Sequence, residues 1–145
     1  MSTNRILVSS ESAFESTVGY SRAVRIGPHI AVAGTTGAVP AADNREIGDI
    51  GAQTREALRR IEVALNQAGA VLCDVVRTRI YVTDISRWRE VAAVHSDVFG
   101  DIRPAATMVE VAALIAPELL VEIEADAYSE ANSPTGGNEP SASAQ

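Results

Sequence analysis

The chain has 145 residues, of which 46% are apolar and 21% charged, as expected for one domain that buries a core. Its formal charge is -7, from 19 acidic and 12 basic residues, and every basic residue is an arginine. The absence of lysine excludes a lysine Schiff base, a P-loop lysine and a lysine general base. The acidic balance also argues against non-specific nucleic-acid binding, which depends on counterion release, although a local arginine patch would escape this argument.

The sequence shows no targeting segment and few metal-binding residues. Its N-terminus lacks a basic segment followed by an apolar one, and no apolar run approaches the ~20 residues of a membrane span. The single cysteine, Cys73, excludes an intramolecular disulfide and a multi-thiolate zinc site, and we expect it to be inert. His29 and His95 lie far apart in the sequence, which argues against a metal site. We expect a soluble cytoplasmic protein.

The composition changes near the C-terminus. Residues 131–145 contain no large apolar side chain and are rich in Ala, Ser, Pro, Gly and Asn, so we expect a disordered tail. Residues 1–130 are expected to form a single domain. At its beginning, the short apolar patch Ile6–Val8 predicts an edge strand or a loosely docked arm.

Two segments have the apolar periodicity of helices. The first is expected to begin after Asp49, whose carboxylate can cap free backbone N–H groups, and its apolar side continues to Ala68 before Gly69 ends it. The second is expected to begin near Ser86 and to end at Gly100. Its predicted apolar stripe consists of Trp88, Val91, His95, Val98 and Phe99.

The other patterned segments predict strands. Gly27 and Pro28 have the chemistry of a hairpin turn between two of them. In chain order, the strands are expected at Tyr20–Ile26, His29–Ala33, Val75–Thr83, Thr107–Ala112 and Leu119–Tyr128. Two strands, a helix, a strand, a helix and two strands predict an α+β sandwich, with both helices on one face of a mixed sheet. The other face would then need cover, which self-association would supply.

The last predicted strand has a strict alternation of apolar and acidic residues. Val121–Tyr128 places its apolar side chains on one face and Glu122, Glu124 and Asp126 on the other. One interpretation is that the acidic face is solvated and has no catalytic role. The alternative is that one carboxylate enters a cleft and acts as a general base, with a pKa tuned by burial.

Other candidate residues have structural explanations. His95 lies on a predicted apolar stripe, which favours a packing histidine over a catalytic one. Trp88 and Phe99 at helical spacing indicate core or interface positions rather than a base-stacking platform. Arg77 and Arg79 alternate on one strand face, where we expect them to pair with the acidic face; the alternative is a replacement anion site.

Several motifs together resemble a known family. Arg103–Val111 (RPAATMVEV) and Leu119–Ala127 resemble the C-terminal signature of the Rid family, also called the YjgF/YER057c/UK114 family. Val75–Asp84 resembles its central strand and Ala31–Gly37 its second-strand motif, in the same order along Tyr20–Tyr128. The resemblance implies a chorismate-mutase-like α+β fold and a homotrimer with three clefts between subunits.

The resemblance also implies a reaction and its residues. Archetypal members hydrolyse reactive imines and enamines to a keto acid and ammonia without a metal or organic cofactor. In them an arginine holds the substrate carboxylate and a glutamate positions or activates water. The glutamate falls on Glu122, a tyrosine on Tyr20 and a small hydroxyl residue on Thr35. Thr107 and Met108, in the C-terminal signature, are expected as further substrate contacts.

One departure from the family pattern affects the expected substrate. Archetypal deaminases read Pro-Ala-Arg where this chain has Ala106 as the third residue, so a simple 2-imino acid loses its main anchor. Arg103 is not an obvious replacement, since a shift of two or three residues along a strand moves the head group by roughly 7–10 Å. The family's asparagine position is Ala92, and His95 stands where an aromatic residue is more usual. The pattern resembles the arginine-less branches of the family, related members of which deaminate other enamines such as aminomuconate.

Three functions follow from these observations. The first is hydrolytic deamination of an enamine or imine other than a simple 2-imino acid, with Glu122 as the base. The second is a ligand-binding or chaperone-like trimer without turnover. The third, RNA cleavage, is the weakest, because the chain is acidic, has no lysine and lacks a paired His/His or His/Lys constellation.

Overall fold

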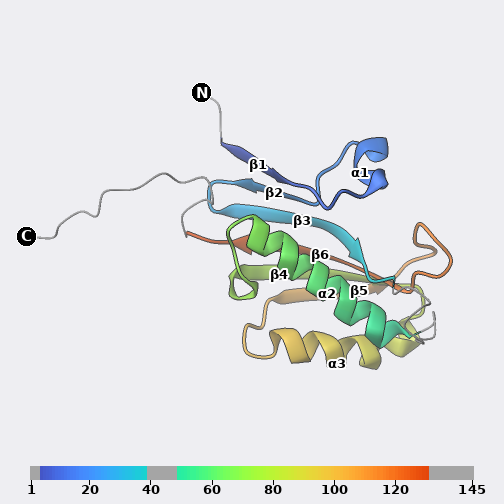
Figure 1. Ribbon diagram of the computed structural model, residues 1–145. Helices are drawn as coiled ribbons and strands as arrows, with labels where there is room; N and C mark the ends of the chain where they lie inside the picture. The colour runs from blue at the N-terminus through green and yellow to red at the C-terminus, as the bar shows by residue number, and fades with distance from the viewer. Residues whose placement is uncertain (1–3, 39–48, 131–145) are drawn as a thin grey trace, which may run out of the picture.

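The computed structural model describes residues 4–38 and 49–130 of the chain (Figure 1). The predicted disordered tail, residues 131–145, lies outside the described residues. The assignment of residues 1–130 to a single domain stays a prediction.

The described residues form one six-stranded sheet and its covering helices. Two short 3-10 helices, η2 (Leu72–Asp74) and η3 (Ile85–Arg87), precede β4 and α3. The elements, in chain order, are β1 (Arg5–Val8), α1 (Ala13–Val18), β2 (Ala23–Ile26), β3 (His29–Thr36), α2 (Ile50–Gln67), β4 (Val75–Val82), α3 (Trp88–Phe99), β5 (Ala105–Glu110) and β6 (Val121–Tyr128).

The strand order in the sheet is β1-β2-β3-β6-β4-β5. All neighbouring strands are antiparallel except β4 and β5, which are parallel and are joined through α3. The long helices α2 and α3 pack beside each other on the same face of the sheet (Figure 1). The predicted fold class, an α+β fold with a mixed sheet and two helices on one face, is confirmed.

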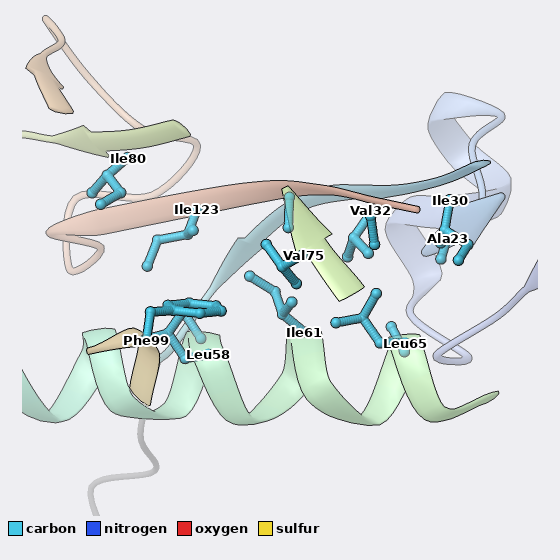
Figure 2. Close-up of a cluster of buried hydrophobic side chains, with 14 of the residues drawn as sticks. Ala23, Ile30, Val32, Leu58, Ile61, Leu65, Val75, Ile80, Phe99 and Ile123 are labelled. Carbon is cyan, nitrogen blue, oxygen red and sulfur yellow. The ribbon is translucent and has the colours of Figure 1, made fainter. Parts of the chain in front are cut away.

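The core lies between α2 and the sheet. Figure 2 shows Leu58, Ile61 and Leu65 of α2 extending toward the strands, where they meet side chains such as Val32 and Ile123. All five side chains are at most 3% exposed. Burial of this apolar surface is the main driving force for docking the helix, because the removal of apolar surface from water is favourable.

The first long helix begins and ends as its sequence predicts. Asp49 is the N-cap residue, and its carboxylate accepts a hydrogen bond from the backbone N–H of Ala52 at 3.0 Å. The helix ends at Gln67, and Gly69 follows with a φ of +80°, a conformation that glycine adopts without steric cost. Local capping chemistry therefore determined both ends of α2.

Other predicted features were wrong or incomplete. The short helix α1, capped by Ser12, was not predicted, because its six residues are too few to show a period. The second long helix begins with the 3-10 turn η3, and Trp88 is 43% exposed rather than buried on an apolar stripe. The predicted edge strand at Ile6–Val8 is confirmed, since β1 is the outermost strand beside β2.

Several strand boundaries in the structure differ by a few residues from the predicted boundaries. β2 begins at Ala23, β3 continues to Thr36, and β5 spans Ala105–Glu110 instead of Thr107–Ala112. The pairing of β3 with β6 contains a register shift between Val32 and Thr35, and such an irregularity changes which side chains face a given side.

Among the described residues, no helix combines the length and apolar character that crossing a membrane requires. The cytoplasmic location stays a prediction.

The core predicts a large difference between two positions on α2. Ile61→Ala, at 0% exposure, is expected to lower the free energy of unfolding by about 2–5 kcal/mol, since it leaves a cavity. Val63→Ala, at 42% exposure on the same helix, is the matched control and should change it by less than about 0.5 kcal/mol. Chemical denaturation at one protein concentration measures both; equal effects would contradict this description of the core.

Candidate functional site

Strand β6 lies in the middle of the sheet, between β3 and β4. Its apolar side chains are buried against the helices, whereas Glu122, Glu124 and Asp126 lie on the opposite face and are only partly exposed. The predicted alternation is therefore present, but the acidic residues belong to a central strand and not to an edge. Three carboxylates on one strand face repel one another unless other groups compensate their charge.

Glu124 and Asp126 have such partners on β4. Arg79 Nη1 lies 3.1 Å from Asp126 Oδ2 and 3.6 Å from Glu124 Oε1. The Tyr81 hydroxyl donates a hydrogen bond to Glu124 at 2.7 Å, and this bond raises the pKa of Tyr81. The expected structural pairing is thus present for Arg79, while Arg77 is exposed and takes part in no ion pair with a described residue. We assign Glu124 and Asp126 to a structural network.

Glu122 has a different environment from its two acidic neighbours. It accepts no hydrogen bond from a described residue, and burial raises the pKa of its carboxyl group. The negative charge of Glu124 raises that pKa further, whereas Arg22 lowers it. A half-buried carboxyl with a raised pKa and a free oxygen is suited to take up and return a proton.

The position of Glu122 depends on a glycine on the neighbouring strand. A Cβ atom at Gly34 of β3 would lie 2.8 Å from Glu122 Oε1, closer than van der Waals contact allows. The carboxylate therefore lies directly over the backbone of β3, in space that any other residue at position 34 would occupy. This close approach gives the glycine of the Ala31–Gly37 motif a packing role.

Arg22 joins the other predicted residues of this site. Its Nη1 atom donates to the carbonyl of Gly34 at 2.8 Å and to Oγ1 of Thr35 at 3.0 Å. Its Nη2 atom donates to the Tyr20 hydroxyl at 3.0 Å, and the guanidinium carbon lies 5.5 Å from the centre of the Tyr20 ring. Thr35 is 2% exposed and also donates to the carbonyl of Ala33 at 2.8 Å.

We call Glu122, Arg22, Tyr20 and Thr35 the carboxylate site. The sequence pattern predicted Glu122, Tyr20 and Thr35 as site residues, but not Arg22. A signal was present, because a residue two positions after Tyr20 in an extended segment shares its face. The site combines one proton-accepting group with a fixed cation and two hydroxyl groups, an arrangement that can orient water and a polar substrate.

A second feature lies on the other face of the sheet, between α3 and β5. Here the described residues enclose a groove of about 450 Å³. We call it the α3–β5 groove. Its apolar walls consist of Ile80, Ala92, Phe99, Pro104, Ala106 and Met108. Its polar lining consists of His95, Ser96, Arg103 and Thr107, with Gly100 at the end of α3.

His95 forms part of the groove wall. One ring nitrogen, Nε2, lies 2.9 Å from the hydroxyl of Thr78, a residue that is 0% exposed. The ring also packs against Phe99 with centroids 4.8 Å apart. Burial lowers the pKa of His95, so the neutral imidazole predominates at pH 7. The predicted packing role is thus present, together with exposure to the groove that the sequence did not indicate.

The register of β5 explains where three residues of the C-terminal signature lie. Ala106 pairs with Thr78 and Met108 with Ile80, so both side chains are on the helix-covered face. Thr107 pairs with Arg79 on the opposite face. The structure thus places the Met108 side chain in the α3–β5 groove, whereas Thr107 lines the groove but its register directs its side chain to the face that carries Glu122.

Within one chain the carboxylate site and the α3–β5 groove do not face each other. Glu122 is on β6, two strands away from β5 in the sheet and on the opposite face from the groove. The structure therefore brings Glu122, Tyr20 and Thr35 together, places Met108 on the opposite face, and places Thr107 on the same face but on β5, with β4 between it and Glu122. In the described part of the chain, no three His, Cys, Asp or Glu residues are grouped so that they could hold a metal ion.

The carboxylate site predicts a measurable effect of its cation. Arg22→Gln removes the positive charge that favours the ionised form of Glu122, so the pKa of Glu122 should rise further above its ordinary value. Carbon-detected NMR of the carboxyl group against pH measures this. Arg77→Gln, an equal change in charge at an exposed position, is the control and should leave the Glu122 titration unchanged. An unchanged or lowered pKa in Arg22→Gln would contradict the proposed electrostatics.

Comparison with known proteins agrees with this fold. A family model described as endoribonuclease L-PSP matches residues 10–129. The crystal structure of Rv2704, a member of the YjgF/YER057c/UK114 family from Mycobacterium tuberculosis, is similar with a TM-score of 0.80 and 70% sequence identity, covering 86% of this chain and 99% of that chain.

Two curated relatives extend the comparison. A RutC family protein of Pyrococcus abyssi is 38% identical over 111 residues, which cover 77% of this chain and 87% of the relative. The 3-aminoacrylate deaminase RutC of Acinetobacter baylyi is 33% identical over 96 residues, which cover 64% of this chain and 75% of the relative. These matches confirm the resemblance stated for the C-terminal signature, and the chain belongs to the Rid family, also called the YjgF/YER057c/UK114 family.

Proposed function

We propose that this protein hydrolyses an enamine or imine metabolite to a carbonyl compound and ammonia, without a metal or organic cofactor. The observation that carries the proposal is the half-buried carboxyl of Glu122, which has a raised pKa and a free oxygen beside the ordered Arg22. The 3-aminoacrylate deaminase among the relatives supports the same reaction class.

The chemistry requires one group that accepts and then returns a proton. An enamine first tautomerises to its imine, and the Glu122 carboxylate accepts a proton from water as the water oxygen bonds to the imine carbon. With the imine nitrogen already protonated by solvent, this addition gives a neutral carbinolamine and leaves the water proton on Glu122. Glu122 then transfers that proton to the nitrogen, the C–N bond breaks, and ammonia leaves as the carboxylate takes the hydroxyl proton and the C=O bond forms; Glu122 finally releases this proton to ammonia or solvent. A pKa raised toward neutrality suits both directions of this transfer.

The complete catalytic cleft is proposed to form between two copies of the chain. In one copy the carboxylate site and the α3–β5 groove lie on opposite faces of the sheet, so a second copy is needed to bring them together. The face that carries Glu122 also has solvent-exposed apolar side chains, including Leu7, Val109 and Tyr128, which are 59%, 42% and 50% exposed. A second copy that covered this face would bury these side chains. The homotrimer expected for the family is the assembly that we propose.

The substrate is proposed to differ from a simple 2-imino acid. Ala106 lines the α3–β5 groove where the family's archetypal deaminases carry an arginine, and an alanine provides no hydrogen bond to a carboxylate. The neighbouring wall also contains the small Ala92. Together these positions leave room for a larger ligand body.

The first test removes the proton-transfer group. Glu122→Gln is expected to lower kcat for ammonia release by about 100-fold to 10,000-fold, the usual contribution of a general base. Glu62→Gln, at an exposed position on α2, is the control and should leave kcat unchanged. Wild-type activity in Glu122→Gln would refute the assigned role.

The second test concerns substrate choice. Given 2-iminobutanoate generated in the assay by a threonine dehydratase, the wild-type protein should turn over at least about tenfold more slowly than an arginine-bearing family member, because one charge-assisted pair contributes about 1.5–3 kcal/mol. Ala106→Arg should increase this turnover. Equal wild-type rates, or no gain at all in Ala106→Arg, would argue against the anchoring role of position 106.

The competing function is that of a binding protein without turnover. It predicts small-carboxylate binding that persists in Glu122→Ala and no ammonia release by the wild-type protein. Measuring ammonia release and ligand binding on the same preparation separates the two functions.

A further inference from the structure

The α3–β5 groove has a charge pattern that differs from the rest of the molecule. Although the chain carries a net charge of -7, no carboxylate is among the described residues that line the groove. The only lining residue there with a permanent charge is Arg103. Among the described lining residues no carboxylate neutralises this cation, so it can attract an anion to the groove.

Arg103 is held at the groove by an unusual backbone conformation. Its φ is +56°, in the left-handed region where glycine is the ordinary residue, and its backbone N–H donates to the carbonyl of Phe99 at 2.8 Å. The arginine side chain is exposed and forms no ion pair or hydrogen bond with a described residue. A glycine would satisfy this turn at lower conformational cost, so folding alone does not account for an arginine here.

His95 provides a second polar contact in the groove. Its Nε2 atom is engaged with the Thr78 hydroxyl, and Nδ1 has no hydrogen-bond partner among the described residues. No buried side-chain nitrogen or oxygen in that part of the chain lacks a partner, so Nδ1 is accessible to solvent. A neutral imidazole on the groove wall can exchange one hydrogen bond with a ligand without opposing the charge of Arg103.

We propose that the α3–β5 groove binds a ligand with one carboxylate and an apolar body, and that Arg103 anchors this carboxylate at a different point of the lining from position 106. The planar guanidinium matches one carboxylate by two parallel hydrogen bonds. A phosphate dianion would keep uncompensated charge, because the described lining offers no second cation. Ile80, Phe99 and Met108 form the apolar wall for the ligand body.

This inference corrects the sequence-based objection to Arg103. The objection assumed that residues 103 and 106 lie on one extended strand, so that a shift of three positions would displace the head group. β5 begins only at Ala105, and Arg103 belongs to the turn that follows α3. The turn returns Arg103 to the groove that Ala106 also lines. The inference rests on the proposed function only in treating this groove as the substrate site.

The experiment measures binding and needs no turnover. Benzoate, which has one carboxylate on an apolar ring, and benzamide, its uncharged counterpart, are titrated into the full-length protein by ligand-observed NMR at low salt. The wild-type protein should bind benzoate at least about tenfold more tightly than benzamide. Arg103→Gly should reduce benzoate affinity to the benzamide level and should not lower the melting temperature, because glycine tolerates the positive φ.

Three further variants locate the effect. Arg103→Lys should keep part of the preference for benzoate. Arg89→Gln removes an equal charge from the start of α3, outside the groove, and should leave both affinities unchanged. Ala106→Trp should fill the groove and weaken both ligands.

The outcomes separate this inference from the proposed reaction. Equal wild-type affinities for the two ligands, unchanged benzoate binding in Arg103→Gly, or full binding in Ala106→Trp would each overturn the assignment. Arg103-dependent benzoate binding without ammonia release from any enamine would support the anchor and refute the proposed hydrolysis. Ammonia release with benzoate binding that does not depend on Arg103 would refute the anchor alone.

Discussion

The alternation of side chains along β6 is the constraint on which the rest of the structure depends. β6 is a central strand, so its two faces meet different environments that cannot be exchanged. Val121 and Ile123 contribute to the core under α2, at 0% exposure, while Glu122 between them is on the other face. A slip of one residue would bury three carboxylates and expose the core, so the same pattern determines the register and places Glu122 in the candidate site.

The three carboxylates on this face of β6 have different environments. Arg79 and Tyr81 compensate Glu124 and Asp126, because β4 pairs with β6 in a register that places the groups side by side. Glu122 is beyond this network and is held in the space above Gly34. Burial of its carboxyl group disfavours the charged form, and the resulting raised pKa is a property that a structural carboxylate does not need.

The α3–β5 groove affects how the alanine at position 106 is interpreted. Position 106 lines the groove with a methyl group, yet the turn after α3 brings Arg103 to the same space. In our proposal, a cation at a different point of the lining corresponds to a different ligand and not to a lost site. The separation of this groove from Glu122 within one chain also makes the assembly of copies part of the proposed chemistry.

Much of the fold was predictable from local patterns. The cap at Asp49, the glycine at 69, the hairpin at Gly27 and the alternation of β6 all act over a few residues, and each is present in the structure. The helix α1 was not predicted because six residues do not show a period. The observed strand ends differ from the predicted ones because they depend on the pairing partners of each strand.

The sequence by itself determined the family resemblance, the mixed sheet with two helices on one face, and the choice of Glu122, Tyr20 and Thr35 as candidates. Only the tertiary structure decided that Arg22 orders Tyr20 and Thr35, and that Arg103 lines a groove with Ala106. The physical reason is that periodicity determines the face on which a side chain lies. Its partners depend on strand register and on turns that bring together residues far apart in the chain.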